Sequence, residues 1–144
     1  MPTPLQLNGK AIRDSLIADM ATPWEVTRVH SGQPPIAPPA GEFATVYESE
    51  PSVLGRTPTI IRIRHNIELF GRWPWPDDGS QIEDAKETRV NQALDVILAA
   101  PGYSIAYAVH FVTHTYDEDV VNNRRQYTVR VQLAFDVAYR DDRN

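Results

Sequence analysis

The clearest pattern in the chain is an alternation of apolar and polar residues near its C-terminus. From Tyr127 to Tyr139 every second residue is apolar or aromatic, over seven alternations, and Arg130 and Asp136 lie between them. A period of two predicts a β-strand with one buried face, because successive side chains point to opposite sides. The alternations span roughly 40 Å at about 3.3 Å per residue, whereas a usual strand has about 5–6 residues. We therefore expect a strand over 124–139 that extends past the core of its own domain.

Two other segments, 57–70 and 103–111, alternate in the same way. In the first, Arg62 and Arg64 stand between isoleucines, so we expect them on the face opposite the apolar one. Two shorter runs rich in β-branched and aromatic residues complete a set of about five strands, at 24–30 and 43–48.

Two segments have the spacing of amphipathic helices, one over 5–21 and one from 80 or 81 to about 100. A proline follows each of them and prevents the helix from continuing. Ser80 and Glu83 have the spacing of a capping box, which predicts where the second helix begins. The remaining stretches are expected as exposed loops, at 31–42, 71–79 and 115–123.

The order of elements is therefore α-β-β-β-α-β-β. Three long strands with one apolar and one mixed face favour a single, mostly antiparallel sheet, with both helices packed on the apolar side. We predict an α/β protein of the α+β type that forms one domain over residues 1–144. The other face of the sheet is left to water or to a partner.

Composition excludes several classes of function. The net charge is −5, which disfavours non-specific nucleic-acid binding because that needs a basic surface. The chain has no cysteine, so disulfides, thiolate metal sites and cysteine nucleophiles are excluded. The N-terminus lacks the features of a leader peptide, and the apolar runs are too short to span a bilayer. An intracellular protein with no membrane contact is the default expectation.

Candidate chemistry is sparse. The sequence has no nucleophile elbow, phosphate-binding loop, dinucleotide fingerprint or zinc-protease motif. His110 and His114 resemble a ligand pair, but on a strand they would lie about 13 Å apart, and His65 reads as a core or subunit-contact histidine. The acidic runs at 77–78 and 117–119 read as solvated turns. We therefore expect no enzyme activity, no cofactor and no metal.

The segment Arg72-Trp73-Pro74-Trp75-Pro76 stands out because it places two tryptophans beside an arginine in a stretch stiffened by proline. Aromatic and arginine side chains of this kind anchor protein interfaces. The same tryptophans could instead fold back onto the core as a plug. Both interpretations stay open at this point. The chain also has twelve arginines against two lysines, a bias that interfaces share with GC-rich codon usage.

The element order resembles that of a known family. An N-terminal helix, a proline-rich excursion, a long strand, a capped helix and a final hairpin ending in Tyr127-Thr128-Val129-Arg130-Val131-Gln132-Leu133-Ala134-Phe135-Asp136-Val137 are similar to the tail terminator and neck proteins of long-tailed bacteriophages. The resemblance implies subunits that form a homo-hexameric ring. Such a ring caps the tail tube and docks onto the head connector, and DNA passes through its lumen. No residue of the family's own is carried over to this chain.

The resemblance turns the outward residues into candidates for partner contacts. We expect Arg62, Arg64, Arg130 and Asp136 to contact neighbouring subunits or the lumen, and Arg72, Trp73 and Trp75 to contact the tail tube or connector protein. The protein would then be part of the virion, at the neck or tail, and be assembled in the host cytoplasm. The alternative is a small ligand-binding protein or enzyme with a pocket between helices and sheet.

Overall fold

The computed structural model describes residues 7–34, 41–99, 105–121 and 123–140. These residues form two α-helices, one short 3-10 helix and six strands. In chain order they are α1 (Gly9–Met20), β1 (Val29–Ser31), β2 (Phe43–Glu48), β3 (Ser52–Arg56), β4 (Ile60–Pro74), η1 (Gly79–Gln81), α2 (Ile82–Ala99), β5 (Ala108–Val121) and β6 (Arg124–Arg140).

All six strands belong to one mixed sheet with the order β1-β2-β4-β6-β5. Strands β2 and β3 follow one another along the same edge of β4, and β1 adds to β2 in parallel. All other pairings are antiparallel. The α+β class is confirmed, but the sheet has six strands rather than about five, and one parallel pair makes it mixed.

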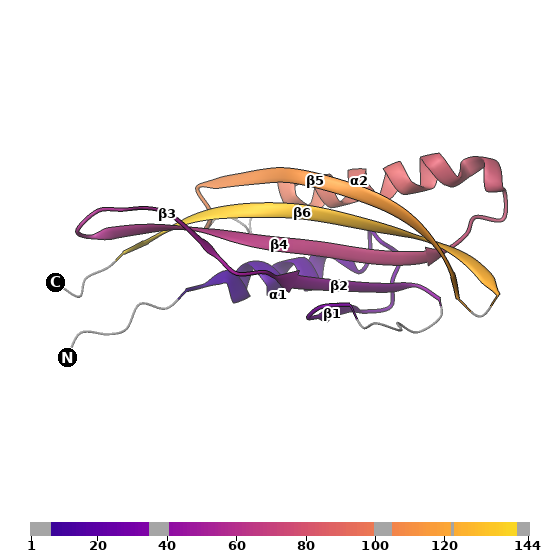
Figure 1. Ribbon diagram of the computed structural model, residues 1–144, viewed down its shortest axis with the longest axis horizontal. Helices are drawn as coiled ribbons and strands as arrows, with labels where there is room; N and C mark the ends of the chain where they lie inside the picture. The colour runs from indigo at the N-terminus through magenta and orange to yellow at the C-terminus, as the bar shows by residue number, and fades with distance from the viewer. Residues whose placement is uncertain (1–6, 35–40, 100–104, 122, 141–144) are drawn as a thin grey trace.

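The sheet is built around β4 and β6, which pair from Ile60 opposite Arg140 to Pro74 opposite Gln126. Their odd-numbered residues point to one face, where the two helices add their own apolar side chains to a single core. Figure 1 shows the β3–β4 hairpin and the β5–β6 hairpin at opposite ends of the long axis. The helix-covered face holds Ile63, Ile67, Leu69 and Trp73 of β4 and Val129, Val131, Leu133, Phe135 and Val137 of β6.

The N-terminal strands differ from the prediction. Trp24 belongs to the turn after α1, because its amide hydrogen-bonds to the carbonyl of Met20, and only Val29–Ser31 of the segment 24–30 is a strand. Strand β3, over 52–56, is missing from the predicted order. It is short, contains a glycine and lies exposed at the sheet edge, so its sequence carries no alternation to detect.

The predicted loop at 115–123 is largely strand, and the predicted loop at 71–79 is strand only as far as Pro74. Strand β4 continues to Pro74, and β5 continues to Val121, so that β6 begins again at Arg124. The turn between β5 and β6 is short and contains Asn123, which has a left-handed φ of 63°. Of the predicted loop 31–42, Ser31 ends β1 and residues 35–40 lie outside the described part of the chain.

The second helix begins with a different cap from the predicted one. Asp78 caps the 3-10 turn that precedes this helix: its side chain accepts a hydrogen bond from the Ser80 amide at 3.0 Å and one from the Ser80 hydroxyl at 2.7 Å. The 3-10 turn η1 follows, and α2 starts at Ile82. The hydrogen bond from the Ser80 hydroxyl, and next the one from the Ser80 amide, lowers the pKa of the Asp78 carboxyl below its ordinary value.

Candidate interface on the open sheet face

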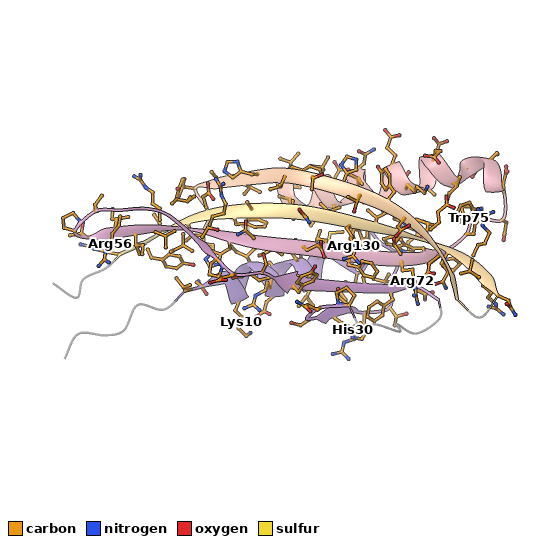
Figure 2. All side chains as sticks on the ribbon, viewed as in Figure 1. Lys10, His30, Arg56, Arg72, Trp75 and Arg130 are labelled. Carbon is orange, nitrogen blue, oxygen red and sulfur yellow. The ribbon has the colours of Figure 1, made fainter. Side chains whose placement is uncertain are left out.

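Five of the seven predicted interface residues lie on the sheet face that no helix covers, which we call the open face. They are Arg62, Arg64 and Arg72 of β4 and Arg130 and Asp136 of β6. The expected register is therefore confirmed: Arg130 points away from the core that holds Val129 and Val131. Figure 2 shows Arg72 and Arg130 along this face.

Asp136 is the centre of an ionic cluster that joins three strands. Arg64 donates to both carboxylate oxygens, with Nε to Oδ1 at 2.8 Å and Nη2 to Oδ2 at 3.0 Å. His110 Nε2 of β5 lies 2.7 Å from Oδ2. The hydrogen bonds from Arg64, and next those from His110, hold the pKa of Asp136 below its ordinary value against the opposing effect of burial. Asp136 is 4% exposed, so it is buried by its own partners although it stands outside the helix-covered core.

A second ionic cluster surrounds Glu68. Arg130 Nη1 lies 3.1 Å from one carboxylate oxygen, and Gln132 Nε2 lies 3.4 Å from the other. The Arg130 guanidinium also lies 4.7 Å from the centre of the Phe70 ring. Burial, followed by the hydrogen bond and negative charge of Glu68, raises the pKa of Tyr47 to about 12. The charged groups of these two clusters, Arg64 with Asp136 and Arg130 with Glu68, thus pair within the subunit.

Beside this cluster the open face is hollowed into a groove of about 600 Å³, which we call the open-face groove. Tyr47, Phe70, Arg72, Thr128 and Arg130 line it from the sheet. Gln33 and Pro34 line it on one side, and Asp117, Glu118 and Asp119 line it on the other. Burial lowers the pKa of Arg72, while the charge of Asp119 acts in the opposite direction.

Trp73 lies in the core, which corrects its assignment as an interface anchor. It is 3% exposed, its indole N–H donates to the carbonyl of Trp24 at 2.7 Å, and its ring meets that of Trp24 edge-on. Tyr127 stacks on Trp73, and Arg89 lies 4.5 Å from its ring centre. Trp73 is an odd-numbered residue of β4, and the odd-numbered residues of this strand face the helices. The plug interpretation therefore applies to Trp73.

Trp75 lies differently. It comes after the end of β4, is partly exposed, and has the Arg125 guanidinium 3.9 Å from its ring centre. Figure 2 shows it near the end of the long axis. Partner contact through Trp75 stays a prediction.

In the described part of the chain, the histidines lie apart from one another and have different partners. Among the described residues, no group of three or more acidic or histidine side chains could hold an ion. A bulge between Phe111 and Thr113 inserts an extra residue into β5, so the side chains after it alternate in the opposite phase. His110 therefore faces the open side, and His114 faces the helix side. His65 is a buried and satisfied core histidine, with Nδ1 3.1 Å from Glu48 and Nε2 2.6 Å from the Tyr139 hydroxyl.

Several residues of this face were not predicted. His110, Glu68, Tyr47 and the carboxylates of the groove join the site only through the pairing of four strands. One signal in the sequence does point to a member of this set. Glu68 has an even number on the strand that carries Arg62 and Arg64, so alternation places it on the same face as those two arginines.

A hollow of about 430 Å³ lies beside Trp73, between the first half of α2 and the end of the sheet. Ala85, Arg89, Tyr127 and Glu25 contribute to its lining. Arg89 Nε donates to the Tyr127 hydroxyl at 3.2 Å, so its main polar group already has a partner. The ligand-binding alternative would use this hollow.

The chain matches no model of a known protein family and no curated protein. None of the described helices has the length and apolar character needed to cross a membrane.

Proposed function

We propose that the protein is a structural virion component that forms a ring, terminates the phage tail tube and joins it to the head connector. The observation that carries the proposal is the placement of exposed apolar side chains on two separate surfaces. One group lies on both faces of the edge strand β5 and on the residues just before it, and the other lies on the β3–β4 hairpin. The exposed apolar residues are Ile105, Tyr107, Val109, Val112, Tyr116 and Val120 on the first surface and Val53, Leu54 and Ile60 on the second.

Two unlike surfaces suit a ring. A closed ring repeats one heterologous contact around its axis, so each subunit needs two different surfaces that complement each other. Apolar side chains that gather outside the core of a soluble subunit are typical of surfaces covered on assembly. The element order supplies the second support, through its resemblance to tail terminators and neck proteins. That resemblance also supplies the six-fold symmetry.

The charges agree with passage of DNA through the lumen. With a net charge of −5, the chain offers DNA no basic field that would hold it. The arginines of the open face that form ion pairs, Arg64 and Arg130, are already bound to Asp136 and Glu68. A ring of this chain would therefore let phosphates pass without retaining them.

The first test is the mass and shape of the purified full chain. Light scattering at high concentration should give about six times the subunit mass of 16.3 kDa, and electron microscopy should show closed rings. If rings form only on the tail, labelled antibody should bind at the head–tail junction of intact particles. Monomers in solution together with label outside the junction would contradict the proposal.

The second test is the loss of the gene product during particle assembly. Without a cap, nothing stops addition of tube subunits, so tails should become uneven in length and remain unattached to heads. Normal particles would exclude the terminating and joining role. If a small molecule instead raises the melting temperature of a monomeric protein, and Arg89→Ala removes that effect, the ligand-binding alternative would replace the proposed ring.

A further inference from the structure

We propose that the β3–β4 hairpin of one subunit docks into the open-face groove of a second copy of this chain. The inference rests on the proposed ring and assigns the hairpin surface a site on the next subunit, the open-face groove, whose acidic wall belongs to β5. We call the hairpin segment 53–62 the basic tip.

The basic tip combines apolar anchors with positive charge. Val53, Leu54 and Ile60 are exposed by 64%, 42% and 37%. Arg56 and Arg62 are also exposed, and no acidic residue occurs between 51 and 64. In the described part of the chain, no carboxylate lies within ion-pair distance of Arg62. The tip therefore presents a guanidinium beside aliphatic side chains.

The open-face groove offers the complementary chemistry. Asp117, Glu118 and Asp119 form one wall, and the rings of Tyr47 and Phe70 lie on the sheet side. Asp117 and Asp119 accept hydrogen bonds from the amides of the residues that follow them, at 2.8 Å each. Glu118 is ion-paired with Lys86 and Arg125, and the negative charge of Asp119 opposes the effect of burial on the pKa of Arg72. An arginine from outside would find acceptors here.

The groove also has room for a hairpin tip. Its volume of about 600 Å³ exceeds that of several side chains. The aliphatic residues of the tip would pack against the half-buried ring of Tyr47, while arginine, whose planar donors suit carboxylates, would meet the acidic wall. Shape and charge thus point to the same occupant.

The two surfaces of one subunit cannot meet each other. Thr59 adjoins the first residue of β4 and Arg72 lies near its last, so about 40 Å of strand separates them at 3.3 Å per residue. Figure 2 shows Arg56 and Arg72 far apart along the long axis. Tip and groove can pair only between copies, in a head-to-tail contact that closes into a ring if the rotation permits.

Pairing through the edge of β5 would be a different contact. That edge carries a bulge at Phe111–Thr113 and three consecutive acidic residues, features that discourage strand addition. We therefore favour the groove, and edge pairing becomes an outcome of the test.

Cysteine cross-linking tests the contact directly, since the natural chain has no cysteine. Thr59→Cys lies in the tip and Gln33→Cys lies on the groove wall, and both positions are exposed and uncharged. Under oxidation the double variant should give a ladder of covalent multimers. The matched control, Thr59→Cys with Ala18→Cys on the exposed side of α1, should stay monomeric on a non-reducing gel. Ladders in both, or in neither, would overturn the proposed contact.

Exchanging the charges of the tip and the groove tests their contact separately from the existence of the ring. Arg62→Glu should raise the concentration at which half of the subunits are assembled by about tenfold or more, and so should Asp119→Arg. Combining both in one chain should restore assembly, whereas Arg28→Glu, an exposed control outside both surfaces, should leave it unchanged. Rings that persist in every variant would overturn the contact between tip and groove but not the ring, and would favour pairing through the edge of β5. A wild-type chain that forms no ring, free or on tails, would overturn the proposed function.

Discussion

Trp73 lies across Gly71, two residues earlier on the same side of β4. A Cβ atom at position 71 would overlap the indole ring of Trp73. The ring also packs against Trp24, Tyr127 and Arg89, so a side chain at position 71 would disturb a packed aromatic cluster. A glycine at 71 is therefore part of the aromatic core and not the end of the strand.

We predict that Gly71→Ala destabilises the protein by about 1–3 kcal/mol, because the added methyl overpacks the aromatic cluster. The midpoint of urea unfolding, followed by circular dichroism, measures the change. Gly55→Ala is the matched control, since no atom lies within 4 Å of its added Cβ. It should change the free energy of unfolding by less than about 0.5 kcal/mol. Equal effects at the two positions would contradict the packing described for Gly71.

Trp73 and Trp75 should respond very differently to truncation. Trp73→Ala removes a ring that is 3% exposed and should cost about 3–5 kcal/mol of folding free energy. Trp75→Ala removes a partly exposed ring and its contact with Arg125, which is worth about 1 kcal/mol. Chemical unfolding of both variants checks the difference. If Trp73→Ala unfolds at the same denaturant concentration as the wild type, its role as a plug is wrong.

The sequence predicted which way residues point along a strand but not where strands begin, end and meet. The alternation from 127 to 139 placed Val129 and Arg130 on opposite faces because parity is a property of one strand. Gly71 and Pro74 suggested a loop, yet pairing with β6 continues past both. Local turn preference lost to tertiary contacts there.

The ionic cluster around Asp136 shows why the site itself was only half predicted. Arg64 and Asp136 are 72 residues apart, and the register that places them opposite each other is a property of two strands. His110 joins them from a third strand. After His110, the bulge in β5 reverses which residues face the open side. Counting by twos from His110 would therefore place Asp117 on the wrong face of the sheet. No single segment carries this information.

A buried polar chain ties the start of α1 to the sheet. The Asn8 amide donates to the Tyr139 hydroxyl at 2.8 Å, that hydroxyl lies 2.6 Å from His65 Nε2, and His65 Nδ1 lies 3.1 Å from Glu48. Since the Tyr139 oxygen accepts from Asn8, its proton is available to His65 Nε2. His65 can then accept from the Tyr139 hydroxyl at Nε2 and donate to Glu48 from Nδ1.

We predict that Tyr139→Phe costs about 1–3 kcal/mol, because it leaves a buried ring nitrogen and a backbone amide without partners. Urea unfolding gives the free energy, and hydrogen exchange of the amides in the first turn of α1 should become faster. Tyr107→Phe is the control, since Tyr107 is 55% exposed. Unchanged exchange in α1 would show that the hydroxyl does not anchor the helix.

The ion pair of Asp136 with Arg64 should make stability depend on acidity. The hydrogen bonds from Arg64 and His110 lower the pKa of Asp136 in the folded state below its ordinary value of 3.8. A carboxyl with a lowered folded pKa contributes stability that is complete above the ordinary pKa and is lost as pH falls through the folded one. Asp136→Asn should therefore be less stable than the wild type at pH 6, and the difference in the free energy of unfolding should narrow as the pH falls below about 4.

Urea unfolding at pH 6, 5, 4 and 3 measures this gap in stability. The control is Glu42→Gln, which changes an exposed carboxylate outside the cluster and should follow the wild type throughout. A gap that stays constant from pH 6 to pH 3 would show that the carboxylate charge of Asp136 adds nothing to the fold.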